Sequence, residues 1–392
     1  MKTYKWFFLV IVSGVLVACP GTSEEELIGD WQRRGMFEGR ERAYTANFVI
    51  GDKGYACCGH IGVSQRRNET YVFDHREGDG SWDRLADFPG PRRSQAVGFS
   101  ANGLGYVGTG WDGNETDFKD FWRYDPYNDV WNEVAPMPEV ALPRRGAIAF
   151  SLLVGGKEYG YVGFGFHEGI KTDERGHLSD IWQFDPEGKT ITEIETEIEI
   201  EEEDGSWTTE IVTETKELPG SWTKVTGYSG FKREGAAVFV VENRAYICNG
   251  KNPANVNDFW MFDPDGAREG KSLWTKKRPM YDSDPNEDYD DDYGGLARSY
   301  GVAYVVEVNG QLRGHIVGGS RTNWEYDHDR DLWIQRTNFY NYMRGEAREG
   351  MVSFSFPNSG RAFVGMGRSG TAYFDDMWEF IPMVDDYIYD DY

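Results

Sequence analysis

Arg92 to Trp131 reads RRSQAVGFSANGLGYVGTGWDGNETDFKDFWRYDPYNDVW. Arginines open this stretch, and four short runs rich in β-forming residues follow, separated by glycine, asparagine, aspartate and proline. Such runs with turn residues between them are typical of a small antiparallel sheet. One sheet of this size cannot bury both of its faces, so the pattern predicts a stable fold only if the unit repeats.

The unit occurs six times along the chain. Each copy contains a glycine element, which we define as Gly or Ala, then an aromatic residue or His, then three residues and a Gly; the copies are Gly54 to Gly59, Gly105 to Gly110, Gly160 to Gly165, Ala245 to Gly250, Gly314 to Gly319 and Ala362 to Gly367. An arginine precedes each copy: Arg42, Arg93, Arg145, Arg233, Arg298 and Arg348. A tryptophan closes five of them: Trp82, Trp131, Trp222, Trp274 and Trp333.

The sixth copy lacks a tryptophan after Pro382, whereas an orphan segment, Ile28 to Trp31, precedes the first copy. We therefore expect the N-terminal segment to supply the last strand of the last sheet and to close a ring. Circular closure removes the exposed sheet edges that would otherwise pair with other chains.

This pattern resembles the kelch repeat, whose spacing is about fifty residues. The Asp-x-Trp-x-aromatic-Asp run of that family is present at Asp120 to Asp125, Asp180 to Asp185 and Asp258 to Asp263, but its double glycine occurs only at Gly318-Gly319. The resemblance covers residues 28–382 and implies an all-β, six-bladed β-propeller. It does not define a function, because propellers host unrelated activities.

One insertion interrupts the repeats, at residues 187–220 in the third unit. It contains two β-branched, partly alternating segments around Asp204-Gly205, which predicts a projecting β-hairpin. The hairpin is either a decoration or a contact for a partner, such as a membrane protein or a second copy of the chain.

Residues 1–18 are predicted to be a signal peptide, because two lysines precede an apolar stretch that is short for a membrane span. The stretch ends Leu16-Val17-Ala18-Cys19, which resembles a bacterial lipobox with Cys19 as the lipidated residue. Residues 19–27 form an acidic tether, similar to the surface-export signal of Bacteroidota lipoproteins, and residues 383–392 form an acidic tail. We expect a protein held at the outer membrane by its lipid alone, facing the periplasm or the cell surface.

The formal net charge of the chain is −25. Such a surface repels nucleic-acid phosphates and anionic membranes, so neither is expected as a partner.

Blade topology places the six arginines and the loops after the glycine elements on one face, which we call the arginine face. Guanidinium groups around a channel mouth would suit a carboxylate or sulfate ligand. Kelch domains of eukaryotic substrate adaptors use arginine at this position to bind acidic peptides, so the resemblance implies a similar face. We expect an acidic glycan or acidic peptide to bind there, with Trp111 and His167 as further contacts. The alternative is that the arginines are tied down and hold the blades in register.

No metal or cofactor is expected. His167 and His177 have no fixed ligand spacing. Asp282-x-Asp284-x-Asn286 begins like an EF-hand loop, but Glu287 replaces the required glycine and no glutamate ends the loop. A solvated acidic loop that partly screens the arginines is the expectation.

No motif singles out a catalytic residue, so the sequence favours a lipid-anchored binding module over an enzyme. One alternative is a sugar mutarotase of the N-acetylneuraminate type, since some secreted bacterial kelch propellers have that activity. It would need an acid or base, for which Glu168, Glu234 and Glu349 are available. The other alternative is a non-catalytic scaffold for a membrane complex.

Overall fold

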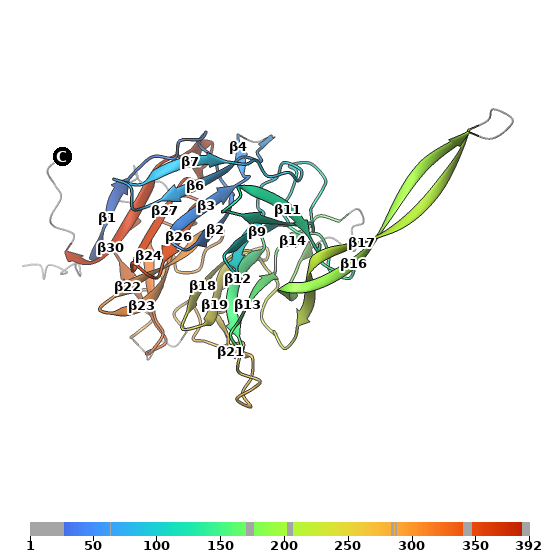
Figure 1. The fold of residues 1–392 in the computed structure, drawn as a ribbon. Coiled ribbons are helices and arrows are strands. Elements are labelled where there is room, and N and C mark those ends of the chain that lie inside the picture. Colours follow the sequence, from blue (N-terminus) through green and yellow to red (C-terminus); the bar gives the residue numbers. More distant parts are fainter. Residues whose placement is uncertain are drawn as a thin grey trace, which may run out of the picture.

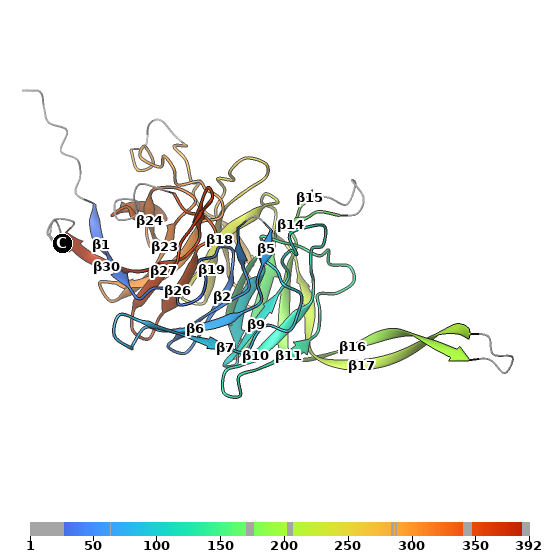
Figure 2. The ribbon, with the colours of Figure 1, turned by 90° about the horizontal axis from the view of Figure 1, so that it is seen from above.

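The computed structural model describes residues 27–62, 64–169, 176–201, 207–283, 286, 288–339 and 347–385. They form six four-stranded antiparallel sheets arranged around a central axis (Figures 1 and 2). The expected six-bladed β-propeller is confirmed. Within the described part of the chain, no helix is both long and apolar enough to cross a bilayer.

The first three blades follow the chain from the inner strand to the outer strand. Blade one contains β2 (Ala46–Ile50), β3 (Lys53–Cys57), β6 (Thr70–Asp74) and β7 (Ser81–Leu85). Blade two contains β8 (Val97–Ala101), β9 (Leu104–Gly108), β10 (Phe121–Asp125) and β11 (Val130–Val134). Blade three contains β12 (Ile148–Val154), β13 (Lys157–Gly163), β16 (Ile181–Glu201) and β17 (Trp207–Val225).

The other three blades complete the ring. Blade four contains β18 (Glu234–Val241), β19 (Arg244–Lys251), β20 (Trp260–Phe262) and β21 (Trp274–Lys276). Blade five contains β22 (Val302–Val308), β23 (Gln311–Val317), β24 (Asn323–Asp327) and β25 (Leu332–Arg336). Blade six contains β26 (Val352–Phe356), β27 (Arg361–Gly365), β30 (Met377–Asp385) and, as its outer strand, β1 (Ile28–Arg34).

The N-terminal strand therefore closes the last blade, as expected. β1 pairs antiparallel with β30, with Trp31 opposite Phe380. The Trp31 indole donates to the Thr337 carbonyl at 3.0 Å and lies edge-on against Phe339. Trp31 thus occupies the closing-tryptophan position that the sixth repeat lacks in sequence.

The hydrophobic core is divided into six clusters, each between two neighbouring blades. Close packing of the blades explains the first glycine of the glycine element. An added Cβ at Gly105 would overlap the Phe48 ring of the preceding blade, and one at Gly160 would overlap Phe99 in the same way. The last glycine has a different role, because it adopts a positive φ of +96° at Gly110 and +99° at Gly165.

That last glycine joins each blade to the next. Its N–H donates to the carbonyl of the arginine that opens the following blade, for example from Gly59 to Arg93 at 2.9 Å and from Gly367 back to Arg42 at 3.0 Å. The intervening bonds run from Gly110, Gly165, Gly250 and Gly319 to Arg144, Arg233, Arg298 and Arg348. The arginine and the glycine element recur together because they are the two halves of one junction.

The third unit corrects one residue of the sequence analysis. The repeat-equivalent arginine is Arg144, not Arg145. We use "junction arginines" for the set Arg42, Arg93, Arg144, Arg233, Arg298 and Arg348, all of which are 0–2% exposed. The expectation that Arg42, Arg93, Arg233, Arg298 and Arg348 line the channel mouth is therefore not met, because their side chains are buried between the blades.

Each junction arginine binds backbone and, in five cases, a carboxylate. Arg144 donates to the Phe164 carbonyl at 3.2 Å and to both oxygens of Asp180 at 2.9 and 2.8 Å. Asp180 also accepts from the Trp182 indole, which explains the Asp-x-Trp run. The other carboxylates are Glu69, Asp120, Asp258 and Asp376. Arg298 donates to neutral oxygens, including Gly295 and Thr322, and burial lowers its pKa to about 9.

The hairpin of residues 187–220 is a continuation of β16 and β17 beyond the body of blade three. It projects away from the ring (Figures 1 and 2) and is paired in register from Lys189 with Pro219 to Glu201 with Trp207. Ile200 lies opposite Thr208, whereas Ile211 lies opposite Glu197. Since side chains alternate along a strand, Ile200 and Ile211 face opposite sides, and a single apolar stripe through both does not form.

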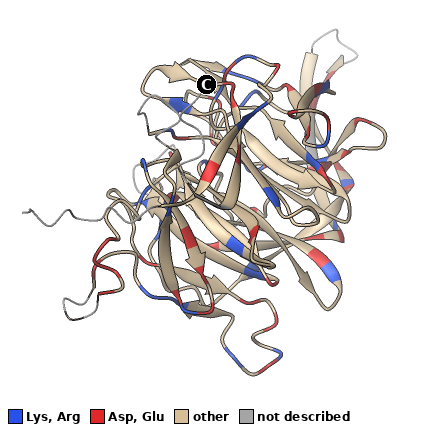
Figure 3. Cartoon of the chain, turned by 90° about the vertical axis from the view of Figure 1, so that its left-hand side faces the viewer, with Lys and Arg blue, Asp and Glu red and all other residues tan. Residues whose placement is uncertain are grey.

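Charges of both signs are interleaved over the ring (Figure 3). Lys2, Cys19, the tether up to residue 26 and the tail from residue 386 lie outside the described residues. The signal peptide and lipid anchor therefore remain predictions.

The junctions give a first stability prediction. Asp180→Ala should lower the free energy of unfolding by about 3–5 kcal/mol, because it leaves the buried Arg144 guanidinium without its carboxylate. Urea denaturation monitored by tryptophan fluorescence measures this. Asp83→Ala, which removes an exposed carboxylate of β7, should change stability by less than about 0.5 kcal/mol. Equal effects of the two variants would contradict the assigned role of Asp180.

Candidate functional site at the channel mouth

Six residues surround the central channel on the arginine face, each two positions after a junction arginine. We call them the mouth ring: Tyr44, Gln95, Gly146, Gly235, Tyr300 and Gly350. All six have φ between +55° and +63°. Each N–H donates to the carbonyl of the ring member in the preceding blade, at 2.8–3.1 Å, so that the hydrogen bonds form a closed circle. Below them, the inner strands enclose a cavity of about 200 Å³.

Glycine at three ring positions lets the two tyrosines lie across the mouth. An added Cβ would lie 2.9 Å from the Tyr300 ring at Gly235, and 2.8 Å from the Tyr44 ring at Gly350. The two tyrosines meet edge to face, with centroids 5.3 Å apart. Their rings therefore form an aromatic surface at the mouth of the channel.

The Tyr300 hydroxyl donates to Glu234 at 2.6 Å. The same carboxylate lies 3.5 Å from His177 Nε2 and 3.7 Å from Lys251 Nζ. Burial, and after it the negative charge of Glu234, raises the pKa of Tyr300. Burial lowers the pKa of His177, although Glu234 opposes this. Near neutral pH, Tyr300 is therefore a proton donor, and Glu234 is its acceptor.

Arg145 lies on the site side of the third junction and differs from Arg144 in its partners. It donates to Asp117 at 3.0 Å and to Glu168 at 2.6 Å. Its guanidinium also lies 4.7 Å from the centre of the Trp111 ring. Burial raises the pKa of Asp117, partly offset by hydrogen bonds from the Glu168 N–H and Arg145.

Two further arginines come from short hairpins on the same face. β4 (His60–Ile61) with β5 (Gln65–Arg66) carries Arg66, whose guanidinium lies 4.8 Å from the Trp111 ring centre. β28 (Arg368–Ser369) with β29 (Ala372–Tyr373) carries Arg368, which donates to Glu349 at 2.6 Å and lies 5.4 Å from the Tyr44 ring centre. A third hairpin, β14 (Phe166–His167) with β15 (Gly176–His177), carries the two histidines.

The predicted site residues thus divide into two groups. Trp111, Arg145 and His167 are brought together beside Asp117, with His167 Nδ1 at 3.6 Å from that carboxylate. The other five predicted arginines belong to the junctions. Glu234 and Glu349, the available acids or bases of the sequence, lie on this face together with Arg66 and Arg368. Tyr44, Tyr300, Asp117 and His60 were not predicted from the sequence.

A signal for the missed tyrosines does exist in the sequence. They occupy the position two residues after the repeated arginine, which is Gln95 in the second unit and glycine in three others. Because this position holds tyrosine, glutamine or glycine in different repeats, it does not stand out in the sequence until its backbone conformation is known.

The side chains that could hold a metal ion lie in the loop between β21 and Arg298. In the described ranges, His, Cys, Asp and Glu side chains group closely enough only at Asp282, Asp290 and Asp291, in the loop before Arg298. The loop histidines have separate carboxylate neighbours, Asp117 for His167 and Glu234 for His177.

Comparisons with known proteins agree with the fold. The Kelch motif family matches residues 110–138, which include the two outer strands of blade two, β10 and β11. The chain is a six-bladed β-propeller that carries a Kelch motif. A solved structure titled "Structure of YjhT" superimposes with a TM-score of 0.58 at 16% identity, over 88% of this chain and 95% of the other.

Curated relatives match over a shorter length. The chain is 30% identical over 88 residues to an N-acetylneuraminate epimerase of Salmonella arizonae, which is 21% of this chain and 23% of the relative. It is 30% identical over 87 residues to that of Haemophilus influenzae strain PittEE, and 29% identical over 82 residues to that of Yersinia enterocolitica. The Haemophilus match covers 21% of this chain and 22% of that protein. The Yersinia match covers 19% of this chain and 21% of that protein. The matched segments thus span under a quarter of each relative's length.

The mouth ring gives a prediction with a matched control. Gly235→Ala should cost about 1–3 kcal/mol more stability than Gly310→Ala, because only the first adds a clash with Tyr300. Both glycines have positive φ, but nothing lies within 4 Å of an added Cβ at Gly310. Chemical denaturation of the two variants side by side checks this, and a smaller cost at Gly235 would contradict the packing described.

His60 gives a prediction on pH. Burial, followed by the charge of Arg66, lowers its pKa from 6.5 to about 4. Between these values the unfolded chain binds the extra proton, so stability is lost as the pH falls from 6.5 towards 4. His60→Gln should reduce the slope of unfolding free energy against pH in this window by roughly 1.4 kcal/mol per pH unit. An unchanged slope would mean that His60 is charged in the folded protein.

Proposed function

We propose that this chain binds an acidic sugar of the N-acetylneuraminate type at the channel mouth and interconverts its anomers. The observation that carries the proposal is the Tyr300–Glu234 hydrogen bond of 2.6 Å at the mouth, on a face that also carries arginines. The partial similarity to N-acetylneuraminate epimerases supports the same substrate class.

Anomer exchange of a cyclic sugar needs one proton removed from the anomeric hydroxyl and one delivered to the ring oxygen as the ring C–O bond breaks. Reclosure from the other face of the carbonyl carbon reverses both transfers, so no net proton is consumed. Glu234 is suited to the first transfer as a base and Tyr300 to the second as an acid, because Tyr300 is protonated near neutral pH and its hydroxyl lies beside the Glu234 carboxylate.

Glu349 and Glu168 are less suited to this role. Glu349 accepts from Arg368 and Glu168 from Arg145, so each carboxylate is already hydrogen-bonded to a guanidinium. Glu234 instead accepts from the Tyr300 phenol, and its cationic neighbour, Lys251 Nζ, is more distant at 3.7 Å.

The substrate carboxylate would be recognised by arginine, which binds planar anions with paired donors. Arg368 is the best placed, since its side chain is 30% exposed and its bond to Glu349 uses one terminal nitrogen. Arg145 is 14% exposed and has two carboxylates already. The aromatic faces of Tyr44 and Tyr300 offer apolar surface for a sugar ring.

Binding without turnover is the second candidate, and the sequence favoured it. The carboxylate partners of Arg145 and Arg368 support it, because such pairs can exchange for an acidic glycan or peptide without any chemistry. The scaffold hypothesis, with the 187–220 hairpin as a contact for a membrane partner, and attachment to the outer membrane through Cys19 also remain proposals.

The function is tested by following anomer exchange of N-acetylneuraminate by NMR, starting from the anomer that a sialidase releases. The wild-type chain should accelerate exchange, and Glu234→Gln and Tyr300→Phe should each lower the rate by about 10²–10⁴-fold. Glu133→Gln and Tyr127→Phe change exposed residues of blade two and serve as controls with full activity.

Ligand titration separates the two candidates. Saturable binding of the sugar with no acceleration by the wild type would support the binding module. A folded Glu234→Gln variant with the wild-type rate would remove Glu234 from the mechanism. Loss of binding in Arg368→Gln, with the fold intact, is expected under either candidate function.

A further inference from the structure

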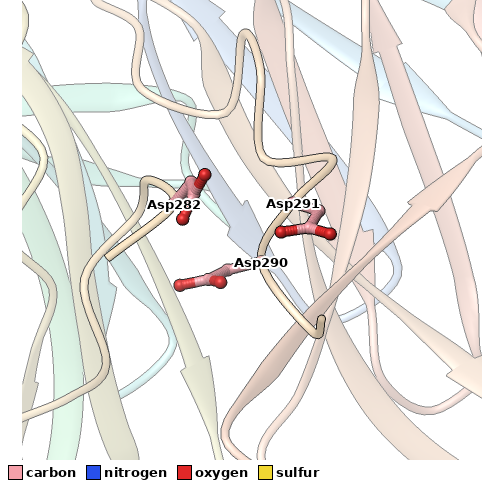
Figure 4. Close-up of side chains that lie close together, drawn as sticks. All are labelled: Asp282, Asp290 and Asp291. Atoms are coloured by element: carbon pink, nitrogen blue, oxygen red, sulfur yellow. The ribbon is translucent and has the colours of Figure 1, made fainter. Parts of the chain in front are cut away.

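The loop between β21 and the junction arginine of blade five gathers three carboxylates. Asp282 lies near its start, and Asp290 and Asp291 lie further along. One oxygen from each lies within 4.8 Å of one from each of the others, and Figure 4 shows the three groups converging from the two arms of the loop. Three carboxylates at this spacing repel one another, so a positive charge from outside the group is needed to stabilise the arrangement.

Asp290 is the decisive member of this group. It is fully buried, with 0% exposure. Its Oδ2 accepts from the N–H and hydroxyl of Ser283 at 2.9 and 2.8 Å, whereas its Oδ1 is buried and has no hydrogen-bond partner among the described residues. A buried carboxylate oxygen with no partner is costly, because its hydration is lost without replacement. Asp282 and Asp291 are exposed, so solvent reaches the group from one side.

The loop around these residues is anchored rather than loosely attached. Met280, Tyr293 and Leu296 are 0–4% exposed and pack into the core cluster between blades four and five. The Tyr293 hydroxyl accepts from the Trp333 N–H at 2.8 Å. Both arms of the loop are therefore fixed to the propeller, and the three carboxylates stand at a defined place between them.

We propose that Asp282, Asp290 and Asp291 form a Ca²⁺ site. A divalent cation would supply the missing partner of Asp290 Oδ1 and neutralise the mutual repulsion. The ligand chemistry is oxygen only, without His or Cys, which suits Ca²⁺ or Mg²⁺ rather than Zn²⁺. Ca²⁺ is the better fit, because one oxygen of Asp290 and the exposed carboxylates of Asp282 and Asp291, with water completing the shell, match its high and flexible coordination number, whereas Mg²⁺ demands near-ideal octahedral geometry.

This site differs from an EF-hand. The incipient EF-hand pattern includes Asp284, which lies outside the described residues, and Asn286. The proposed ligands instead come from Asp282 and from two adjacent aspartates eight and nine positions later. Sequence spacing gives no indication of such a set, because the intervening residues determine how the two arms approach.

The test is equilibrium dialysis of the full chain against ⁴⁵Ca²⁺ after chelator treatment, together with thermal unfolding in Ca²⁺ and in EDTA. The wild type should bind one Ca²⁺ per chain with a dissociation constant below about 1 mM, and Ca²⁺ should raise its melting temperature. Mg²⁺ at the same concentration should compete about tenfold less well.

Two variants with the same change of charge separate a built site from diffuse attraction. Asp290→Asn should weaken Ca²⁺ binding at least about tenfold. It should also melt higher than the wild type in EDTA, because it removes a buried charge. Asp288→Asn, in an exposed acid of the same loop, should bind like the wild type.

The proposal is overturned if the wild type binds no Ca²⁺ at about 1 mM, the weak end of the range for extracellular Ca²⁺ modules. It is equally overturned if Asp288→Asn loses as much affinity as Asp290→Asn, since binding would then follow net charge. If Asp290→Asn does not fold, the double variant Asp282→Asn/Asp291→Asn carries the same expectation for binding, because both residues are exposed.

Discussion

One backbone hydrogen bond, from the last glycine of one glycine element to the carbonyl of the next arginine, recurs at every junction between neighbouring blades of this propeller. The geometry of that bond demands a positive φ at the glycine and brings the arginine chain down between the blades. There the guanidinium binds the carbonyl of the residue before the last glycine of its own blade, as Arg144 binds Phe164. In most blades it also binds a carboxylate that accepts from a tryptophan indole. The arginine, the glycine element and the Asp-x-Trp run are far apart in the repeat, but all three meet at the junction between blades.

The same junction determines where the site can be. Two residues beyond each arginine, the backbone enters the mouth ring, and its closed circle of hydrogen bonds fixes six Cα positions around the channel. Different side chains fit at these positions, because the ring is held together by backbone hydrogen bonds and not by side chains. Tyr300 and Tyr44 use this freedom, and the glycines beside them provide the space for their rings. The side chains of the candidate site therefore come from the least repetitive part of a repetitive sequence.

This division explains what the sequence could predict. The six registers, the closing strand and the position of the hairpin followed from repeated spacing, which reports on hydrogen-bonded pairing. The burial of individual side chains could not be predicted from spacing. Two adjacent arginines, Arg144 and Arg145, have opposite environments, and spacing alone did not tell which of them lies in the junction. The Tyr300–Glu234 pair and the three aspartates were equally invisible, since each depends on how loops from different positions approach one another.

Because β1 pairs with β30, blade six is built from both ends of the described chain. Every other blade is a continuous piece of chain, whereas this one is held shut by strand pairing and by the packing of Trp31 against Phe339. Opening the ring requires β1 to detach from β30 and blade six to separate from blade one, where Gly367 and Tyr44 also make backbone hydrogen bonds across the junction. The channel mouth, built from all six blades, thus depends in part on a strand that contributes no residue to it.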